Sequence, residues 1–149
     1  MPRLLAVLLT AGAVVWAAAV AASAAAHGTG WSALVHDLAS AVCHQRPERS
    51  FAVEGHPFPV CARCTGLYVS GSLGALAAWF GPGRVVRRSR DVVLLAALPT
   101  AATIPVEWLG LSPLSNAIRA AAALPLGAAA GWVFVRLLRS EERARRDAL

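Results

Sequence analysis

The chain has 149 residues, of which 57% are hydrophobic and 15% are charged, and its mean hydropathy is +0.57. A soluble domain of this length carries more charge and less apolar sequence, so the composition predicts a membrane protein whose main partner is the lipid bilayer. The formal net charge is +6, but the arginines flank apolar segments, which predicts membrane topology and no nucleic-acid partner.

The first apolar segment runs from Leu4 to Ala26 without a charged residue, long enough to cross a hydrocarbon core of about 30 Å. The short basic start at Arg3 and the small residues near the end of the segment also fit a signal peptide. Because the apolar run is longer than the usual core of a signal peptide, we favour a transmembrane helix over residues 1–26. Both interpretations export the residues that follow.

An amphipathic helix is predicted next, in the sequence WSALVHDLASAV. Its apolar residues recur at spacings of three and four: Trp31, Leu34, Val35, Leu38 and Val42. We expect this helix to lie along the outer membrane surface. A helix that continues through Cys43 and His44 brings both onto the face of His36, two turns earlier. Residues 45–59 contain three prolines and a glycine, which predicts an ordered loop or a short hairpin.

A second membrane helix is predicted from the start of the CARCTG sequence to Phe80. A start at Thr65 leaves it short, so we favour a start near Cys61. Gly66, Ser70 and Gly74 recur at the four-residue spacing that lets helices approach closely in lipid. Glycine is also tolerated in membrane helices generally, and that alternative stays open.

Two more apolar segments, at about 92–110 and 113–138, are joined by a short turn and predict an antiparallel helix hairpin. Ser112 followed by Pro113 resembles an N-cap with proline at the first helical position, so we expect the last helix to start there. The predicted fold class is an all-α membrane protein. It is a bundle of about four transmembrane helices with an outward-facing amphipathic helix and a Cys/His-containing loop.

Threading four helices in order places most arginines on one side of the membrane, which the positive-inside rule identifies as the cytoplasm. Those arginines are Arg3, Arg84, Arg87, Arg88, Arg90, Arg136, Arg139, Arg143, Arg145 and Arg146. Both termini are then cytoplasmic, and the Cys/His loop lies outside. The predicted organisation is an N-terminal helix (1–26), a membrane domain (27–138) and a cytoplasmic basic tail (139–149).

The cysteines lie in two motifs, CHQRPERSF at 43–51 and CARCTG at 61–66. Cys61 and Cys64 are three residues apart, so on the first turn of a helix their sulfurs point to the same side. A helix N-terminus favours the thiolate, and Arg63 adds to this effect if it is close. Thiolate is the form that binds metals and attacks disulfides.

These motifs, with VEWLGLSPLSNAIR after the third apolar segment, resemble the prokaryotic membrane-protein family known as domain of unknown function 2085. The resemblance covers about residues 36–131, with the first helix as an addition. The first motif is matched by Cys43, His44, Gln45, Pro47, Arg49, Ser50 and Phe51. The second is matched by Cys61, Arg63, Cys64, Gly66 and Tyr68, and a later Ser-Asn-Arg element by Ser115, Asn116 and Arg119. Glu107 stands where we expect an aspartate.

The resemblance implies a polytopic helical fold in the cytoplasmic membrane of a prokaryote and a shared site, without an established reaction. We predict a metal site there. Its predicted ligands are Cys43, His44, Cys61 and Cys64. Three cysteines and a histidine form a tetrahedral zinc donor set, so zinc is the predicted cofactor, with copper or iron as alternatives because soft thiolates suit them too. Because Cys43 and His44 are adjacent, one of them can point away, and His36 or His56 then completes the shell.

Two other interpretations of the thiols stay open. In the first, Cys61 and Cys64 cycle between dithiol and disulfide as a membrane thiol-disulfide oxidoreductase, with Cys43 as a resolving or relaying thiol. The βαβ context of thioredoxin-like proteins is absent from the pattern. In the second, a structural disulfide forms in an oxidising compartment and leaves one cysteine unpaired. An extracytoplasmic or membrane protein partner would be compatible with each interpretation.

Ionisable groups inside membrane segments usually face the bundle interior and pair. Glu107 lies near the end of the third apolar segment and Arg119 near the start of the fourth, so we predict that they pair. The pair either locks the helix hairpin or forms a charged floor beneath the cysteines that binds substrate or moves protons. The predicted supporting polar residues are Gln45, Arg49, Ser50, Arg63, Glu107, Asn116 and Arg119.

Overall fold

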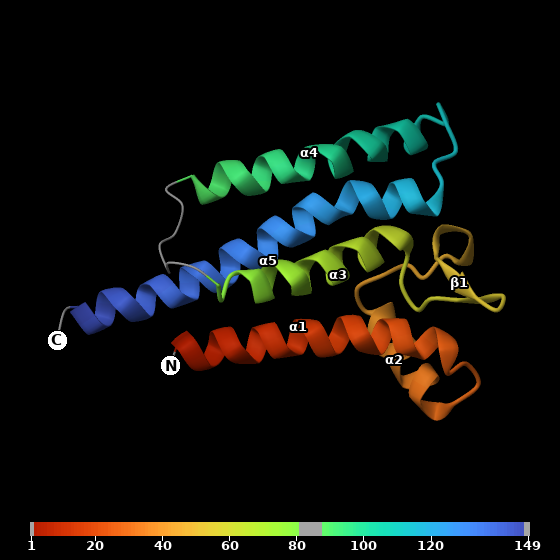
Figure 1. The fold of residues 1–149 in the computed structure, drawn as a ribbon. Helices are drawn as coiled ribbons and strands as arrows, with labels where there is room; N and C mark the ends of the chain where they lie inside the picture. Colours follow the sequence, from red (N-terminus) through yellow and green to blue (C-terminus); the bar gives the residue numbers. More distant parts are fainter. Residues whose placement is uncertain (1, 81–87, 148–149) are drawn as a thin grey trace.

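The computed structural model describes residues 2–80 and 88–147 of the chain (Figure 1). The helices are α1 (Pro2–Ala25), α2 (Gly30–Ser40), a 3-10 turn (Pro47–Arg49), α3 (Ala62–Ala77), α4 (Ser89–Trp108) and α5 (Asn116–Asp147). Strands β1 (Ala52–Val53) and β2 (His56–Pro57) form an antiparallel hairpin, as the sequence predicts for this loop.

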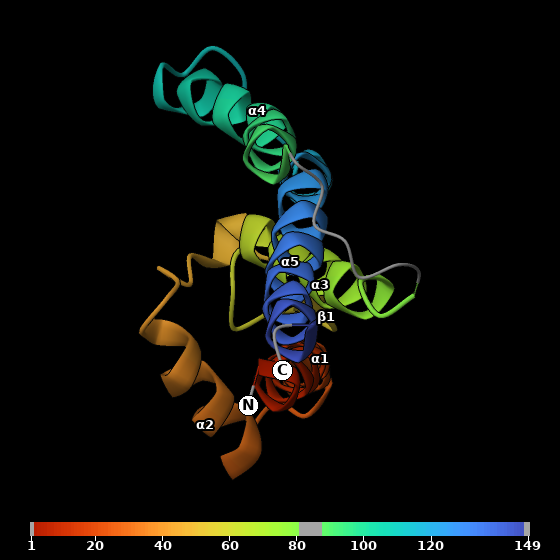
Figure 2. The ribbon, with the colours of Figure 1, turned by 90° about the vertical axis from the view of Figure 1, so that its left-hand side faces the viewer.

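The chain is an all-α membrane protein built as a bundle of four long helices beside the smaller α2. Helix α5 lies between α4 on one side and the α1–α3 pair on the other (Figure 2). Within the described residues, three segments are long and apolar enough to cross a membrane: α1, α4 and the Asn116–Glu141 part of α5. Helix α3 has 16 residues, about 24 Å, so it is shorter than the predicted segment and falls short of the hydrocarbon core.

Helix α4 packs mainly on α5, and none of its apolar residues is buried. Its apolar side chains therefore face the surroundings, as expected of a helix in lipid, where the solvent is itself apolar.

Helices α3 and α5 make the most extensive helix contact, and glycines lie where their backbones meet. A Cβ atom added at Gly66 would lie 2.5 Å from the carbonyl oxygen of Ala120. One added at Gly74 would collide with the carbonyl of Ala128, and one added at Gly127 would collide with Ser70. Of the two interpretations of the small-residue spacing, close backbone approach describes this interface.

Two helix ends differ from the sequence prediction. Helix α5 begins at Asn116, not at Pro113, because Ser115 is its cap: the backbone N–H of Ile118 donates to Ser115 Oγ at 3.3 Å. Helix α2 ends at Ser40, so the predicted continuation through Cys43 and His44 is wrong.

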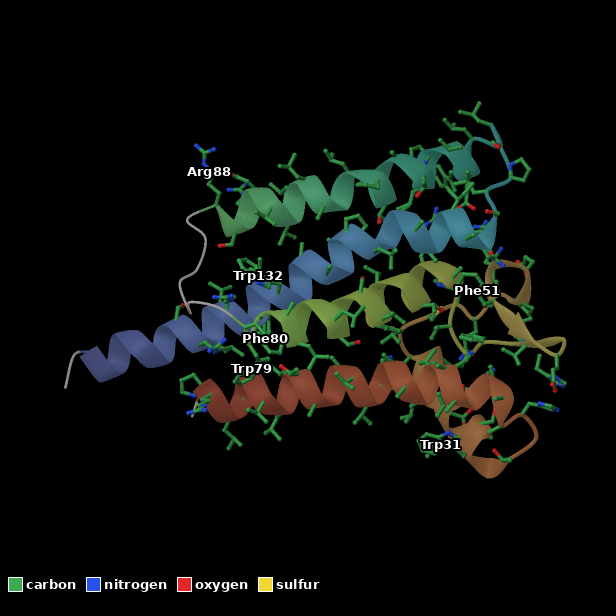
Figure 3. All side chains as sticks on the ribbon, viewed as in Figure 1. Trp31, Phe51, Trp79, Phe80, Arg88 and Trp132 are labelled. Atoms are coloured by element: carbon green, nitrogen blue, oxygen red, sulfur yellow. The ribbon has the colours of Figure 1, made fainter. Side chains whose placement is uncertain are left out.

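The apolar face predicted for α2 is left mostly uncovered by the protein. Val35 is buried, whereas four of its neighbours on that face are exposed: Trp31, Leu34, Leu38 and Val42. Trp31 projects from the outer edge of α2 (Figure 3). An uncovered apolar face of this kind suits a helix that lies at a membrane surface.

The start of α1 and the end of α5 lie at one end of the bundle, and α2 and the β-hairpin lie at the other (Figure 1). The start of α1 and the end of α5 therefore lie at the end of the bundle away from the Cys/His loop, and the side of the membrane that each end faces stays a prediction. Arg84 and Arg87, on which that prediction also draws, lie outside the described residues.

At the end near the termini, two arginines of α5 turn back onto the C-terminus of α3. Arg139 Nη1 donates to Ala78 O at 2.6 Å, and Arg136 Nη2 donates to Phe80 O at 2.7 Å. Because carbonyl oxygens at a helix C-terminus lack intrahelical donors and carry partial negative charge, these guanidinium groups stabilise the end of α3. Trp79, Phe80 and Trp132 mark this region in Figure 3.

Candidate metal centre

Three cysteines from two separate segments meet at the end of the bundle that carries α2. The Sγ atoms of Cys43, Cys61 and Cys64 all lie within 4.8 Å of one another, and all three cysteines are free. The two sulfurs of the CxxC pair, Cys61 and Cys64, are 3.5 Å apart. Thiolates that share a tetrahedral zinc ion at about 2.3 Å have sulfurs about 3.8 Å apart, so the three side chains fit a metal after a shift of about 1 Å.

Gln45 explains how Cys43 reaches the other two cysteines. The backbone leaves α2 after the hydrogen bond from Cys43 N to Ala39 O, and Gln45 takes a positive φ of 50°. Its Nε2 donates to His36 O at 2.6 Å and to Pro59 O at 3.0 Å. Gln45 therefore joins the end of α2 to the segment that leads into Cys61.

The environment of the cluster favours a thiolate at Cys61, whereas the hydrogen bond with Cys61 and burial raise the pKa of the Cys64 thiol. Cys61 is the residue before the first turn of α3, and its backbone N–H donates to Cys43 Sγ at 3.1 Å. The hydrogen bond that Cys61 shares with Cys64 lowers the pKa of the Cys61 thiol from 9.0 to about 5. The backbone N–H groups of Cys64 and Arg63 act in the same direction, and burial opposes them. Cys61 is thus a thiolate at neutral pH.

One side of the thiol cluster is apolar. Cys43 is buried in a cluster with Val20, Val35, Ala39 and Val60. Trp16 of α1 and Tyr68 of α3 pack against that cluster and meet edge to face, with ring centroids 6.0 Å apart. This packing keeps water from the thiols on the side of α1 and α2.

The other side faces a cavity of about 390 Å³. The three cysteines line it together with His44 and four arginines: Arg46, Arg49, Arg63 and Arg119. Exposed Trp108 and Val42 complete the lining. Any ligand or metal that reaches the sulfurs through this cavity passes guanidinium groups.

The histidines divide between two places. His44 is exposed and lines the cavity of the thiols, but among the described residues no histidine joins the three sulfurs within 4.8 Å. His36 and His56, the alternatives for a fourth ligand, line a different cavity. There the His56 ring stacks on His27 with centroids 3.4 Å apart, and His36 Nδ1 lies 3.1 Å from Ser32 O.

The predicted ion pair between Glu107 and Arg119 is present, with Nε and Oε1 2.5 Å apart. The other carboxylate oxygen, Oε2, lies 2.7 Å from Arg63 Nη2. Arg63 also donates to Thr103 Oγ1 of α4 at 3.2 Å. One carboxylate therefore links three helices, α3, α4 and α5.

The double pairing of Glu107 is the main feature that sequence reasoning missed. The sequence analysis considered Arg63 only as a group that stabilises the thiolates if it is close to them. The sequence contains one signal for this contact, since charged groups close to an apolar segment usually pair. In the structure the Arg63 side chain reaches Glu107 and Thr103 of α4 and also lines the cavity of the thiols.

Asn116 extends this network to the outer loop. Its Oδ1 accepts from Arg119 Nη1 at 2.6 Å, and its Nδ2 donates to the carbonyl oxygen of Ser50 at 2.7 Å. Ser50 is buried, and its Oγ donates to Arg46 O at 3.0 Å. Most of the predicted supporting residues therefore belong to one network of polar contacts, which connects the outer loop to α3, α4 and α5. Its members are Ser50, Arg63, Glu107, Asn116 and Arg119. Arg49 also lines the cavity, and among the described residues its side chain makes no ion pair and no hydrogen bond.

Comparison with known proteins identifies relatives in two archaea. An uncharacterized protein of Methanothermobacter thermautotrophicus is 35% identical over 86 residues, which are 58% of this chain and 78% of that protein. The uncharacterized protein MJ1492 of Methanocaldococcus jannaschii is 30% identical over 95 residues, 59% of this chain and 58% of that protein's length. No solved structure matches the chain. The profile of the predicted-membrane-protein family DUF2085 matches residues 43–133, which include all three cysteines and the whole polar network. The chain belongs to this family of predicted membrane proteins.

Proposed function

We propose that this protein is a metal-binding membrane protein that holds one zinc ion through Cys43, Cys61 and Cys64. The observation that carries the proposal is the meeting of three sulfurs from two segments within 4.8 Å. A lone CxxC pair brings two ligands together by local geometry, whereas the third sulfur comes from a separate segment positioned by Gln45. Three converging thiols beside a cavity are what a metal site requires.

The electrostatics support metal binding by thiolates. A metal ion binds the deprotonated sulfur, and both the N–H of Cys61 and the N-terminus of α3 stabilise negative charge at the cluster. Three thiolates and a divalent ion carry a net charge of about −1, which the arginines of the cavity offset. Copper(I), which accepts three soft ligands, and iron are the other ions that this donor set suits.

His44 is the fourth ligand that we propose. It follows Cys43 directly, is exposed, and lines the same cavity as the three sulfurs. His36 and His56 line a different cavity, so they serve as matched controls. Zinc bound by all four ligands would be a closed site, and zinc bound by three would keep a position open to the cavity.

Metal binding would fasten the end of α2 to the start of α3. Since Cys43 and the CxxC pair belong to different segments, the free energy of binding also stabilises the loop between them. We further propose that this end of the bundle faces outward in a prokaryotic cytoplasmic membrane, with both termini inside, because described arginines such as Arg88 and Arg139 lie at the other end (Figure 3).

The test is the metal content of protein purified in a neutral detergent. Wild-type protein should carry about one equivalent of metal, and each single Cys→Ser variant should lose most of it. His44→Ala should lower the affinity, whereas His36→Ala should leave the metal content unchanged. Protein that is metal-free as isolated, and that takes up no zinc, copper(I) or iron after full reduction, contradicts the proposal.

The 3.5 Å separation of the Cys61 and Cys64 sulfurs favours a second candidate, a membrane thiol-disulfide oxidoreductase. The Cys61 thiolate would attack a substrate disulfide, break its S–S bond and release one substrate thiol, which leaves a mixed disulfide on Cys61. Cys64 would then give up its proton, displace the second substrate thiol and close a Cys61–Cys64 disulfide. This alternative expects no stoichiometric metal, a disulfide that a mild reductant opens, and independent reaction of Cys43. Thiol counts with and without a chelator separate it from the metal proposal.

A further inference from the structure

We propose that the cavity beside the thiols binds a phosphate group through its arginines. The cavity holds four guanidinium groups, and no carboxylate is among the described residues that line it. Glu107 lies behind two of the arginines and pairs with both. Arg46 has Glu48 at 4.0 Å, with both side chains exposed to solvent, where an ion pair contributes little. Four guanidinium groups set against Glu107, Glu48 and the Cys61 thiolate still leave this region with an excess of positive charge.

Donors remain available for a ligand. Arg49 lines the cavity and makes no recorded ion pair or side-chain hydrogen bond within residues 2–80 and 88–147. Arg63 Nε is buried without a hydrogen-bond partner in the structure. Arg49 is therefore the guanidinium group that the protein leaves open to an oxyanion in the cavity.

Two of the arginines that line the cavity, Arg63 and Arg119, are held in place by the protein. Arg63 and Arg119 are fixed by the same carboxylate, and Arg119 is also fixed by Asn116. Guanidinium groups that are already ordered lose less side-chain entropy on binding, and their fork of N–H donors matches the oxygens of phosphate. Glu107 and Asn116 thus hold two arginines of the binding site in place.

The residues at the mouth of the cavity are compatible with two sources of the phosphate group, a lipid headgroup and a free anion in solution. Exposed Trp108 and Val42 line it, and Val42 continues the uncovered apolar face of α2. If α2 lies at the membrane surface, the cavity opens at the depth of lipid phosphates, with apolar side chains beside the acyl chains. A free phosphate in solution offers the same oxyanion without the lipid.

The site needs no metal, so this inference goes beyond the proposed function and does not depend on it. Arg49→Gln is the informative variant, because Arg49 has no protein partner whose loss would unfold the chain. Arg90→Gln is the matched control. It removes the same charge from an exposed position at the start of α4, away from the cavity.

Full-length protein in a neutral maltoside detergent would be titrated calorimetrically with inorganic phosphate, at constant ionic strength set with chloride. In a second arm, the same protein would be exposed to vesicles of phosphatidylcholine and phosphatidylglycerol in equal amounts, and retained lipid would be identified by native mass spectrometry. The metal content of each variant would be measured in parallel.

We expect saturable binding in at least one arm, weakened about tenfold or more by Arg49→Gln and unchanged by Arg90→Gln, since a charge-assisted contact is lost. Retention of phosphatidylglycerol that phosphate displaces identifies the lipid headgroup as the ligand, and phosphate binding without lipid retention identifies the free anion. No binding in either arm, or equal effects of the two variants, overturns the proposal. A normal metal content in Arg49→Gln would show that the loss of phosphate binding leaves the metal site intact.

Discussion

The ion-pair network at Glu107 supports a sharp prediction about stability. Glu107→Gln keeps the shape of the side chain but removes the one negative charge between two arginines. Its side chain is 8% exposed, and those of Arg119 and Arg63 are 12% and 18% exposed. The change therefore leaves two poorly hydrated guanidinium groups without a counter-charge at the interface of α3, α4 and α5.

Removing one partner of a buried pair costs about 3–5 kcal/mol, because the remaining charge is stranded. The introduced amide retains one acceptor oxygen, so we expect a loss near the lower end of this range, about 3 kcal/mol, in the free energy of unfolding. Arg63→Gln or Arg119→Gln leaves the carboxylate with its other arginine and should cost less, about 1–2 kcal/mol.

The assay is reversible unfolding in mixed micelles of dodecyl maltoside and dodecyl sulfate, followed by helical circular dichroism. The double variant Glu107→Gln/Arg119→Gln should cost less than the sum of the two single changes, because the stranded charge is removed with its partner. If Glu107→Gln costs no more than either arginine change, or if the effects add strictly, the two contacts do not share one carboxylate as described.

Three further predictions concern packing, acidity and orientation. Gly74→Ala should destabilise the α3–α5 contact by about 1–3 kcal/mol in the same unfolding assay, because the added methyl group meets the backbone of Ala128. Gly71→Ala is the control and should be tolerated, because the nearest atom to its added Cβ, Gly127 O, is 3.6 Å away. With a pKa of about 5, Cys61 of the metal-free protein should react with iodoacetamide at a rate that rises near pH 5 and is level above neutrality. A rate that still climbs between pH 8 and 9 would contradict this. A membrane-impermeant maleimide should label Cys61 and Cys64 from outside intact cells after reduction and chelation, and labelling confined to lysed cells would reverse the orientation.

The sequence predicted the features that depend on the length of apolar segments and on the membrane depth of charged residues. Apolar length located α1, α4 and most of α5, because a membrane span requires a minimum run of apolar residues. The pairing of Glu107 with Arg119 followed from their similar depth on two helices joined by a short turn. The hairpin in residues 45–59 followed from its prolines and glycine.

Local capping and tertiary contacts decided the features that were missed. Ser112 and Pro113 form an acceptable helix start, yet Ser115 caps α5, because a capping residue is selected by the contacts of the whole segment, here through Asn116 and the outer loop. The end of α2 depended on Gln45, whose positive φ and two long-range hydrogen bonds no periodicity reveals. The apolar face of α2 was predicted to lie along the membrane surface, and the structure leaves most of that face uncovered by protein.

The central claim is that three thiolates share one metal ion. X-ray absorption at the zinc edge of the zinc-loaded, detergent-purified protein measures the ligand atoms and their distances directly. We predict three sulfur neighbours at about 2.3 Å and one nitrogen or oxygen neighbour at about 2.0–2.1 Å. A Cys43→Ser variant that still binds zinc should show two sulfurs. Wild-type zinc with two or fewer sulfur neighbours would show that Cys43, Cys61 and Cys64 do not hold the ion together.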